Sequence, residues 1–185
     1  MPLPSAASRS KLHTRQIVIE GYRRDDGLWD IEGHLVDTKT YGFANIDRGQ
    51  VEAGEPLHEM WLRLTIDETY VVRDVEASTD AAPFNLCPVI TPIFKELIGL
   101  SVGPGWQRAV RERVGGVKGC THHVEMLGPL ATVAFQTIRR DASQNAGPPG
   151  TENGERPRIL DTCHALASDG PVVKRDLPQF YTGAK

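Results

Sequence analysis

The stretch RQIVIEGYRRDDGLWDIEGHLVDTK (residues 15–39) decides the first half of the fold, because it reads as two strands joined by a tight turn. The run DDG at 25–27 is a hairpin signal, since a glycine takes a positive φ at little cost. A turn there predicts three cross-strand neighbours: Tyr22 beside Asp30, Glu20 beside Glu32 and Val18 beside His34.

Two further segments read as strands. LHEMWLRLTID (57–67) alternates between an apolar face and a mixed one, as a half-buried strand does. The apolar face carries Met60, Leu62, Leu64 and Ile66, and the mixed face carries Glu59, Trp61, Arg63 and Thr65. TYVVRDVEA (69–77) is a fourth candidate. The first half therefore predicts a mostly antiparallel, curved sheet.

The second half changes to a helical period. PVITPIFKELIGL (88–100) and GWQRAVRERVGG (105–116) predict short helices that stop at glycines. CTHHVEMLGPLATVAFQTIRR (120–140) predicts the longest helix, with a kink or break just ahead of Pro129. Strands followed by helices predict an α+β fold, in which the N-terminal sheet packs against the C-terminal helices.

The expected organisation is one domain with two irregular segments. A chain of 185 residues is long enough for a single domain with a sizeable core. We expect a disordered tail over residues 1–14, a single α+β domain over 15–185, and a mobile Gly/Pro-rich loop over 141–157.

Charge and composition exclude several function classes. A net charge of -3 gives no broad basic field for nucleic acid or an anionic membrane. Polar residues interrupt every apolar run before it reaches membrane-spanning length, and the N-terminus lacks the apolar core of an export signal. Three sparse cysteines favour free thiols in a reducing cytoplasm.

Titratable residues gather on one face of the predicted hairpin. Strand alternation puts Asp30, Glu32 and His34 on the same face, with Tyr22 and Glu20 across from them. Crowded carboxylates and an imidazole would shift one another's pKa values, which is typical of a polar pocket floor. A solvated sheet face explains the same pattern, so both interpretations stay open.

The third strand carries two further candidates. His58 is in phase with the apolar face, where a histidine is more often a structural group than a catalyst. Arg63 and Trp61 lie on the opposite face. An arginine there can hold an anion or a phenolate, or it can be a surface residue.

The run GCTHHVE (119–125) marks the start of the longest helix. Thr121 is a plausible N-cap, which places His122 and His123 in the first turn, where the helix dipole favours neutral imidazole. Adjacent helical residues point about 100° apart, so at most one of the two histidines faces a given pocket. Glu125 is three residues from His122 and can orient it.

Zinc is an alternative for the same segment. Cys120, His122, Cys163 and His164 are residue types that zinc binds. Their spacing is weak, however, because neither a C-x2-C nor an H-x3-H pair is present. A cysteine nucleophile paired with a histidine is a further alternative at this place.

Four stretches resemble the bacterial domain-of-unknown-function family 2889. They are RRDDGLWDIEGHLVDTKTYGF (23–43), GEPLHEMWLRLTID (54–67), VGGVKGCTHHVEML (114–127) and DTCHALASDGPVV (161–173). The family pattern has one histidine followed by leucine after Gly-Cys-Thr, so His122 matches it and His123 departs from it. The resemblance implies a lyase that removes a hydroxymethyl carbon as formaldehyde from lignin-derived aromatic dimers.

The implied reaction assigns roles to the candidate residues. A retro-aldol-type cleavage needs a base and a partner for developing phenolate charge. His122 or His34 would be the base, Tyr22 or Tyr41 a proton relay, and Arg63 the phenolate partner. The expected substrate-binding residues are Trp29, Trp61, Asp30, Glu32 and His58.

The expected reaction requires no metal and no cofactor. Its partner is a small aromatic substrate, with no nucleic acid and no membrane, and a homodimer is left open. The rival functions are a non-catalytic small-molecule binding module and a zinc-dependent hydrolase or lyase. We predict that the hairpin face with His34 meets the helix start with His122.

Overall fold

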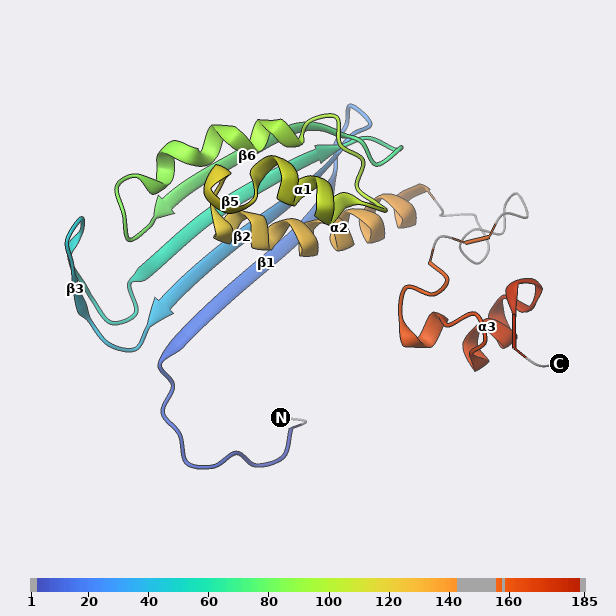
Figure 1. The fold of residues 1–185 in the computed structure, drawn as a ribbon, viewed down its shortest axis with the longest axis horizontal. Helices are drawn as coiled ribbons and strands as arrows, with labels where there is room; N and C mark the ends of the chain where they lie inside the picture. Colours follow the sequence, from blue (N-terminus) through green and yellow to red (C-terminus); the bar gives the residue numbers. More distant parts are fainter. Residues whose placement is uncertain (1–2, 143–155, 158, 184–185) are drawn as a thin grey trace. The chain divides into compact units, whose positions relative to one another are not determined.

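The computed structural model describes residues 3–142, 156–157 and 159–183 (Figure 1). The chain divides into two compact units, Met1–Ile138 and Arg139–Lys185, and each is described by itself. Residues 3–12 contain neither helix nor strand. The loop predicted to be mobile at 141–157 lies for the most part outside the described residues.

The first unit contains a four-stranded sheet, a two-stranded ribbon and the longer helices. Its strands are β1 (His13–Arg23), β2 (Trp29–Lys39), β3 (Phe43–Asn45), β4 (Gly49–Val51), β5 (Pro56–Ile66) and β6 (Val72–Ala81). Its helices are the 3-10 helix η1 (Cys87–Leu97), α1 (Trp106–Val114), the 3-10 turn η2 (Gly116–Lys118) and α2 (Thr121–Ala142), which ends just beyond the unit.

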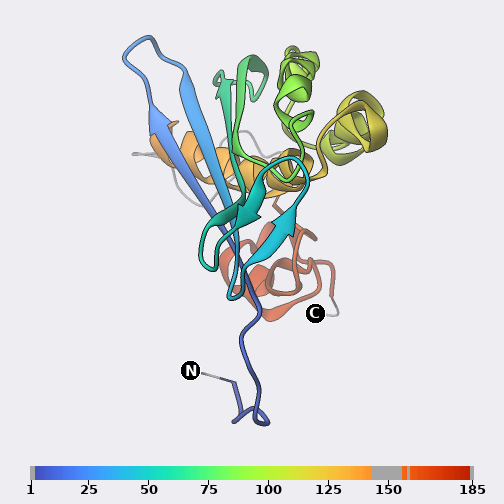
Figure 2. The same ribbon diagram turned by 90° about the vertical axis from the view of Figure 1, so that its left-hand side faces the viewer.

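The large sheet is antiparallel with the order β1-β2-β5-β6, which Figure 1 shows as four long strands side by side. The α+β prediction is confirmed. The hairpin register is also confirmed, because Val18 pairs with His34 and the turn contains Gly27 with a φ of 83°. The β3–β4 ribbon stands at one end of the sheet, nearest the viewer in Figure 2.

The two faces of the sheet differ in burial. On β2, the odd-numbered residues from Trp29 to Asp37 are buried and the even-numbered ones are partly exposed. The buried face, here called the helix face, packs against η1, α1 and α2 to form the main core. The other face is here called the open face. Gly33 lies on the helix face, where an added Cβ would come within 3.3 Å of Met126 Sδ, so α2 packs closely on β2 there.

Two helical segments differ from their predictions. The segment containing Pro88 and Pro92 forms the 3-10 helix η1 instead of a regular α-helix, because proline lacks the N–H that an α-helical ladder needs. α2 runs from Thr121 through Pro129 without a break, so of the two predicted alternatives, a kink or a break, the break was wrong. Buried residues on either side of the proline, Leu127 and Leu130, hold the helix against the sheet.

The second unit is small and mostly irregular. It contains the 3-10 turn η3 (His164–Leu166), α3 (Pro171–Asp176) and the 3-10 turn η4 (Pro178–Phe180). Its own core consists of Leu160, Val173 and Leu177. Across the described residues of both units, no helix is long and apolar enough to cross a membrane.

Candidate functional site

The structure separates the predicted site residues onto two faces of the sheet. His34 lies on the open face and is stacked on Trp61 with ring centroids 3.5 Å apart. His122 contacts His58. His58 lies on the helix face, because it stands two positions before the buried Met60 on β5. The two faces are separated by the sheet itself, so His34 and His122 do not meet, and that prediction was wrong.

The remaining candidates follow the same alternation. Tyr22, Asp30, Glu32 and Arg63 belong to the open face with His34. Trp29 lies in the main core with 8% exposure, where it cannot form the wall of an open pocket. Tyr41 is exposed in the connection after β2 and contacts Phe43. Among the predicted site residues, His58 and His122 come together on the helix face, whereas His34 with Trp61 and Arg63 with Glu32 come together on the open face.

The buried carboxylate of Asp37 is the centre of a group of side chains on the helix face. This group is here called the helix-face cluster and consists of His13, Arg15, Asp37, His58, His122 and Glu125. Asp37 is 1% exposed and accepts two hydrogen bonds from Arg15, at 2.8 Å from Nε and 2.6 Å from Nη2. His13 Nε2 lies 3.2 Å from the same carboxylate and His58 Nδ1 lies 3.0 Å from it. A bidentate arginine pair of this kind fixes the orientation of the carboxylate. Asp37 therefore holds β1, β2 and β5 in register at this end of the sheet.

Two imidazoles face each other beside Asp37. The ring centroids of His58 and His122 are 3.9 Å apart, with the planes tilted by 33°. With its proton on Nδ1 and donated to Asp37, His58 keeps the lone pair on Nε2. The side chain of His58 is 13% exposed and that of Asp37 is 2% exposed. The pair thus consists of an oriented imidazole and a second one at its face.

The first turn of α2 places His122 beside His58. The helix begins at Thr121, and the N–H of Val124 donates to the carbonyl of Cys120 at 3.0 Å, so Cys120 precedes the first turn. Thr121 is thus the first helical residue. Cys120 Sγ lies 3.7 Å from His122 Nδ1 and 3.9 Å from the sulfur of Met60.

His123 points away from the cluster, as the helical geometry requires. It is fully buried, its Nε2 lies 2.9 Å from the carbonyl oxygen of Ser78, and its ring contacts Phe94. His123 is therefore a core histidine. The prediction that only one of the adjacent histidines can face the site is confirmed.

Glu125 completes the cluster through Arg15 rather than through His122 directly. Arg15 Nη1 donates to Glu125 Oε2, while the other nitrogens of its guanidinium hold Asp37. The side chain of Arg15 is 29% exposed and that of Glu125 is 49% exposed. One arginine thus ties the first turn of α2 to the sheet.

The charges of the cluster set its protonation states. Burial would raise the pKa of Asp37, but the hydrogen bonds and charge of Arg15 outweigh it and lower that pKa to about 2. Burial lowers the pKa of His58, and the neighbouring His122 lowers it further. Burial also lowers the pKa of His122, with the charge of Arg15 acting in the same direction. At neutral pH Asp37 is therefore a carboxylate, and His58 and His122 are neutral imidazoles.

These pKa shifts predict a titration pattern. In an NMR titration of the imidazole protons, we expect His58 and His122 to protonate below the ordinary value of 6.5. Because the unfolded chain binds those protons first, stability should fall as the pH drops below 6.5 towards the folded pKa values. Spectra of the His58→Gln and His122→Ala variants assign the two signals, because each variant lacks the signal of the histidine that was replaced. A normal or raised pKa for both would contradict the described burial.

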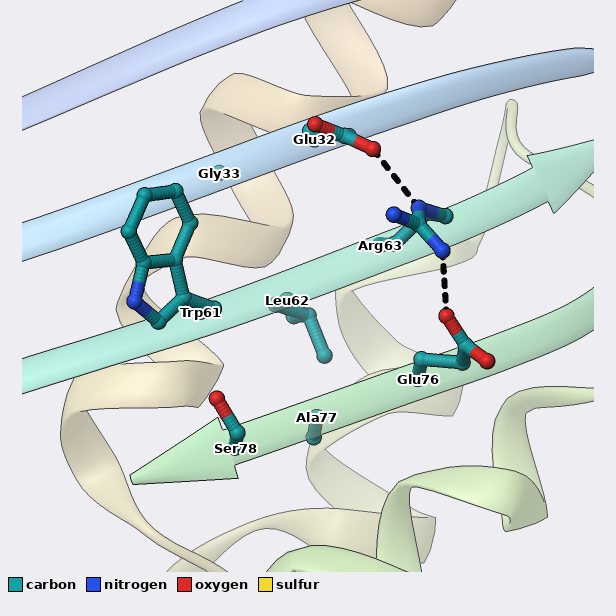
Figure 3. A pocket seen from close by; sticks show the side chains of 8 residues that line it. All are labelled: Glu32, Gly33, Trp61, Leu62, Arg63, Glu76, Ala77 and Ser78. Carbon is teal, nitrogen blue, oxygen red and sulfur yellow. Dashed lines mark hydrogen bonds and ion pairs between the residues drawn. The ribbon is translucent and has the colours of Figure 1, made fainter. Parts of the chain in front are cut away.

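The open face has a hollow of its own, shown in Figure 3. Its volume is about 270 Å³, and Trp61 and Arg63 stand on either side of it. The guanidinium of Arg63 is held between two carboxylates, with Nε 2.7 Å from Glu32 and Nη1 donating to Glu76. Its charge is therefore already balanced, and the sheet separates it from the imidazole pair.

A metal ion is the main alternative occupant of the helix-face cluster. One ligand atom each from Asp37, His58 and His122 lies within 4.8 Å of the others. Two imidazoles and a carboxylate are a familiar metal-binding set. Both oxygens of Asp37, however, already accept hydrogen bonds from Arg15, and the fixed positive charge of that arginine opposes a divalent cation.

The predicted zinc set is distributed over both units. Cys120 and His122 lie in the first unit, whereas Cys163 and His164 lie in the second, where Cys163 is exposed. Asp37 and Arg15 were absent from the predicted site although the hairpin register contains them. Three positions along the hairpin from the pair Val18–His34, Arg15 lies opposite Asp37. Asp37 is also a charged residue in phase with the buried side of β2.

The comparison with known families fits this first unit. Residues 13–136 match the family described as Protein of unknown function (DUF2889). The chain belongs to this family. The DUF2889 match spans the whole helix-face cluster from His13 to Glu125, whereas the Asp-Thr-Cys-His-Ala run at 161–165 lies outside it. No curated protein and no solved structure matches the chain.

Proposed function

We propose that this DUF2889 protein is a cofactor-independent carbon–carbon lyase whose base lies in the helix-face cluster. The observation that carries the proposal is the neutral pair of His58 and His122 beside the buried Asp37. Base catalysis needs an unprotonated group at the working pH, and the lowered pKa values of both imidazoles provide it. We place the reaction in the cytoplasm on the sparse cysteine content.

The proposed substrate is a lignin-derived aromatic dimer, a class that comes from the resemblance of the sequence motifs. In such a phenolic dimer, opening of a cyclic ether creates a quinone methide. An imidazole takes the proton of the hydroxymethyl O–H, and the bond between that carbon and the dimer breaks. The carbon leaves as formaldehyde, and the electron pair forms a new C=C bond and restores the ring as a phenolate. The imidazolium returns its proton to the phenolate, so no oxidant is consumed.

The geometry changes the roles within this scheme. His122 keeps the role of base, and His58 replaces His34 because it is the imidazole that faces His122. Arg15 replaces Arg63 as the nearest cation, since Arg63 lies on the other side of the sheet. The open-face residues Trp61, Asp30 and Glu32 are not part of this proposed site.

A formaldehyde-release screen tests the proposed function. The purified chain is incubated with phenolic dimers that carry a cyclic ether and a hydroxymethyl group. We expect equimolar formaldehyde and a dimer product that is smaller by that carbon, measured by derivatisation and mass spectrometry. A binding module would instead retain an intact dimer without product. Absence of formaldehyde across the whole dimer series would refute the lyase.

A metal-dependent hydrolase or lyase is the second candidate, and the mutual approach of Asp37, His58 and His122 favours it. The discriminating measurements are the metal content of the purified chain and its activity after treatment with a chelator. We expect no stoichiometric divalent metal and full activity in chelator, because both carboxylate oxygens of Asp37 already accept hydrogen bonds from Arg15. One equivalent of metal whose removal abolishes turnover would instead establish the second candidate.

A further inference from the structure

The two edges of the large sheet are not equally protected. At the β6 edge, the segment after η1 bonds to the beginning of the strand: Gly99 N donates to Val72 O at 2.8 Å and Val72 N donates to Leu100 O at 2.9 Å. At the other edge, β2 is the only strand in the described part of the chain that pairs with β1, and it does so over all 11 residues of β1. A long unprotected edge is a template for another strand, and proteins usually blunt it with proline, bulges or charge.

β1 lacks two of those protective features, and its charged residues lie on either side of an apolar centre. It contains no proline, and its register with β2 is unbroken, whereas the β2–β5 and β5–β6 pairs both contain irregularities. The middle of the strand is apolar, with Ile17 and Ile19 on the helix face and Val18 on the open face. Val18 is 42% exposed. The apolar, regular centre of β1 is therefore available for pairing.

The hairpin determines which backbone groups of β1 point outward. Arg24 N donates to Leu28 O at 2.9 Å, and at the far end Thr40 N donates to Leu12 O at 3.2 Å. Hydrogen-bonded pairs alternate along an antiparallel ladder, so the even-numbered residues of β1 bond to β2. The outward N–H and C=O groups then belong to the odd-numbered residues, from His13 to Arg23.

We propose that β1 pairs with β1 of a second copy of this chain, antiparallel and centred on Val18, so that two sheets join into one. This register is the one that pairs the strand over its full length, since Val18 is the midpoint of His13–Arg23. It opposes Val18 to its own counterpart and Ile17 to Ile19 of the partner subunit. Gln16 then faces Glu20 of the partner subunit, so the charged residue meets a neutral one.

Neighbouring registers are less favourable. Centring the pair on Ile19 would oppose Arg15 to Arg23 and Val18 to Glu20. Centring it on Ile17 would oppose Val18 to Gln16 and Arg15 to Ile19. Like charges or mismatched polarity across a strand pair destabilise it. Self-complementarity of the full strand is the reason to favour a second copy over an unrelated strand.

The proposed register also brings the partner close to the helix-face cluster. It opposes His13 to Arg23 of the partner subunit, and His13 Nε2 lies 3.2 Å from Asp37. Opposed residues in an antiparallel pair share a face of the sheet. A second cation would thus stand next to the cluster in the dimer, although the assembly itself does not depend on the proposed lyase activity.

A cross-linking experiment tests the register. At the non-hydrogen-bonded central pair the Cα atoms would lie about 4.5 Å apart, which suits a disulfide. In a Cys163→Ser background, chosen because Cys163 is exposed, we expect Val18→Cys to form a disulfide dimer on mild oxidation. Gln16→Cys and Glu20→Cys should cross-link when mixed and not when alone. Failure of Val18→Cys to cross-link, or equal cross-linking of each variant alone, would overturn the register.

A charge experiment tests the dimer itself. By light scattering across a dilution series, we expect the intact chain to be dimeric at high concentration. Val18→Lys should raise the dissociation constant about tenfold or more, since two ammonium groups would face each other. Mixing Val18→Lys with Val18→Glu should restore the dimer, and Val18→Thr is the uncharged control. A monomer at every concentration, or a dimer unaffected by Val18→Lys, would contradict the proposal.

Discussion

Replacing Asp37 by asparagine is expected to lower the free energy of unfolding at pH 7 by about 3 kcal/mol, because Arg15 and two histidines lose a buried anionic partner. The measurement is urea denaturation followed by circular dichroism. Asp30→Asn is the matched control, since Asp30 lies on the open face of the same strand and pairs with the exposed Arg24. The control should lose less than about 1 kcal/mol.

The pH dependence gives a second signature of the same carboxylate. Its folded pKa is about 2, against an unfolded value of 3.8. A depressed pKa contributes stability that is fully present above the unfolded value and is lost as the pH falls through the folded one. The gap between the intact chain and Asp37→Asn should therefore shrink between pH 4 and pH 2, where Asp37 itself takes up a proton. A gap that does not depend on pH would show that the charge of Asp37 is not the cause.

Removing His122 is expected to reduce formaldehyde release by about 100-fold or more, the usual contribution of a general base. His58→Gln should cause a loss of similar size, because glutamine can still donate to Asp37 but carries no basic nitrogen. Both variants should keep the fold, checked by thermal unfolding. The rate for the intact chain should fall as the pH drops below 6.5, where the two lowered pKa values are reached.

His34→Ala is the control that distinguishes the two faces. His34 contacts Trp61 and Glu59 on the open face, and the sheet separates it from the imidazole pair. Turnover by this variant should stay near that of the intact chain. If His34→Ala loses activity while His122→Ala keeps it, the reaction takes place in the open-face hollow beside Arg63, and the helix-face assignment is wrong.

Local patterns in the sequence were enough to predict the sheet. The register of the first hairpin follows from a turn whose glycine accepts a positive φ, and the alternation of β5 places Met60 and Trp61 on opposite faces. The 3-10 form of η1 was harder to predict, because its apolar residues recur much as they would in an α-helix. The uninterrupted α2 depends on core packing on both sides of Pro129, which a local rule for proline does not include.

The candidate site was predicted only in part, for a related reason. The open face carries many titratable residues close together in sequence, so the sequence analysis assigned catalytic roles to His34 and Arg63 on that face. The helix-face cluster combines residues from β1, β2, β5 and α2, and only tertiary packing decides that His122 comes to lie on His58. Asp37 had a usable signal, namely a charge in phase with the buried residues of its strand.

The ion pair between Arg15 and Glu125 joins residues that are 110 positions apart in the chain. During synthesis, the first hairpin can form with Arg15 already bound to Asp37 well before residues 120–125 leave the ribosome. His122 arrives only with the first turn of α2. A nascent or truncated chain that ends before this turn would thus lack the second imidazole. The two imidazoles come together only when the first turn of α2 packs against β5.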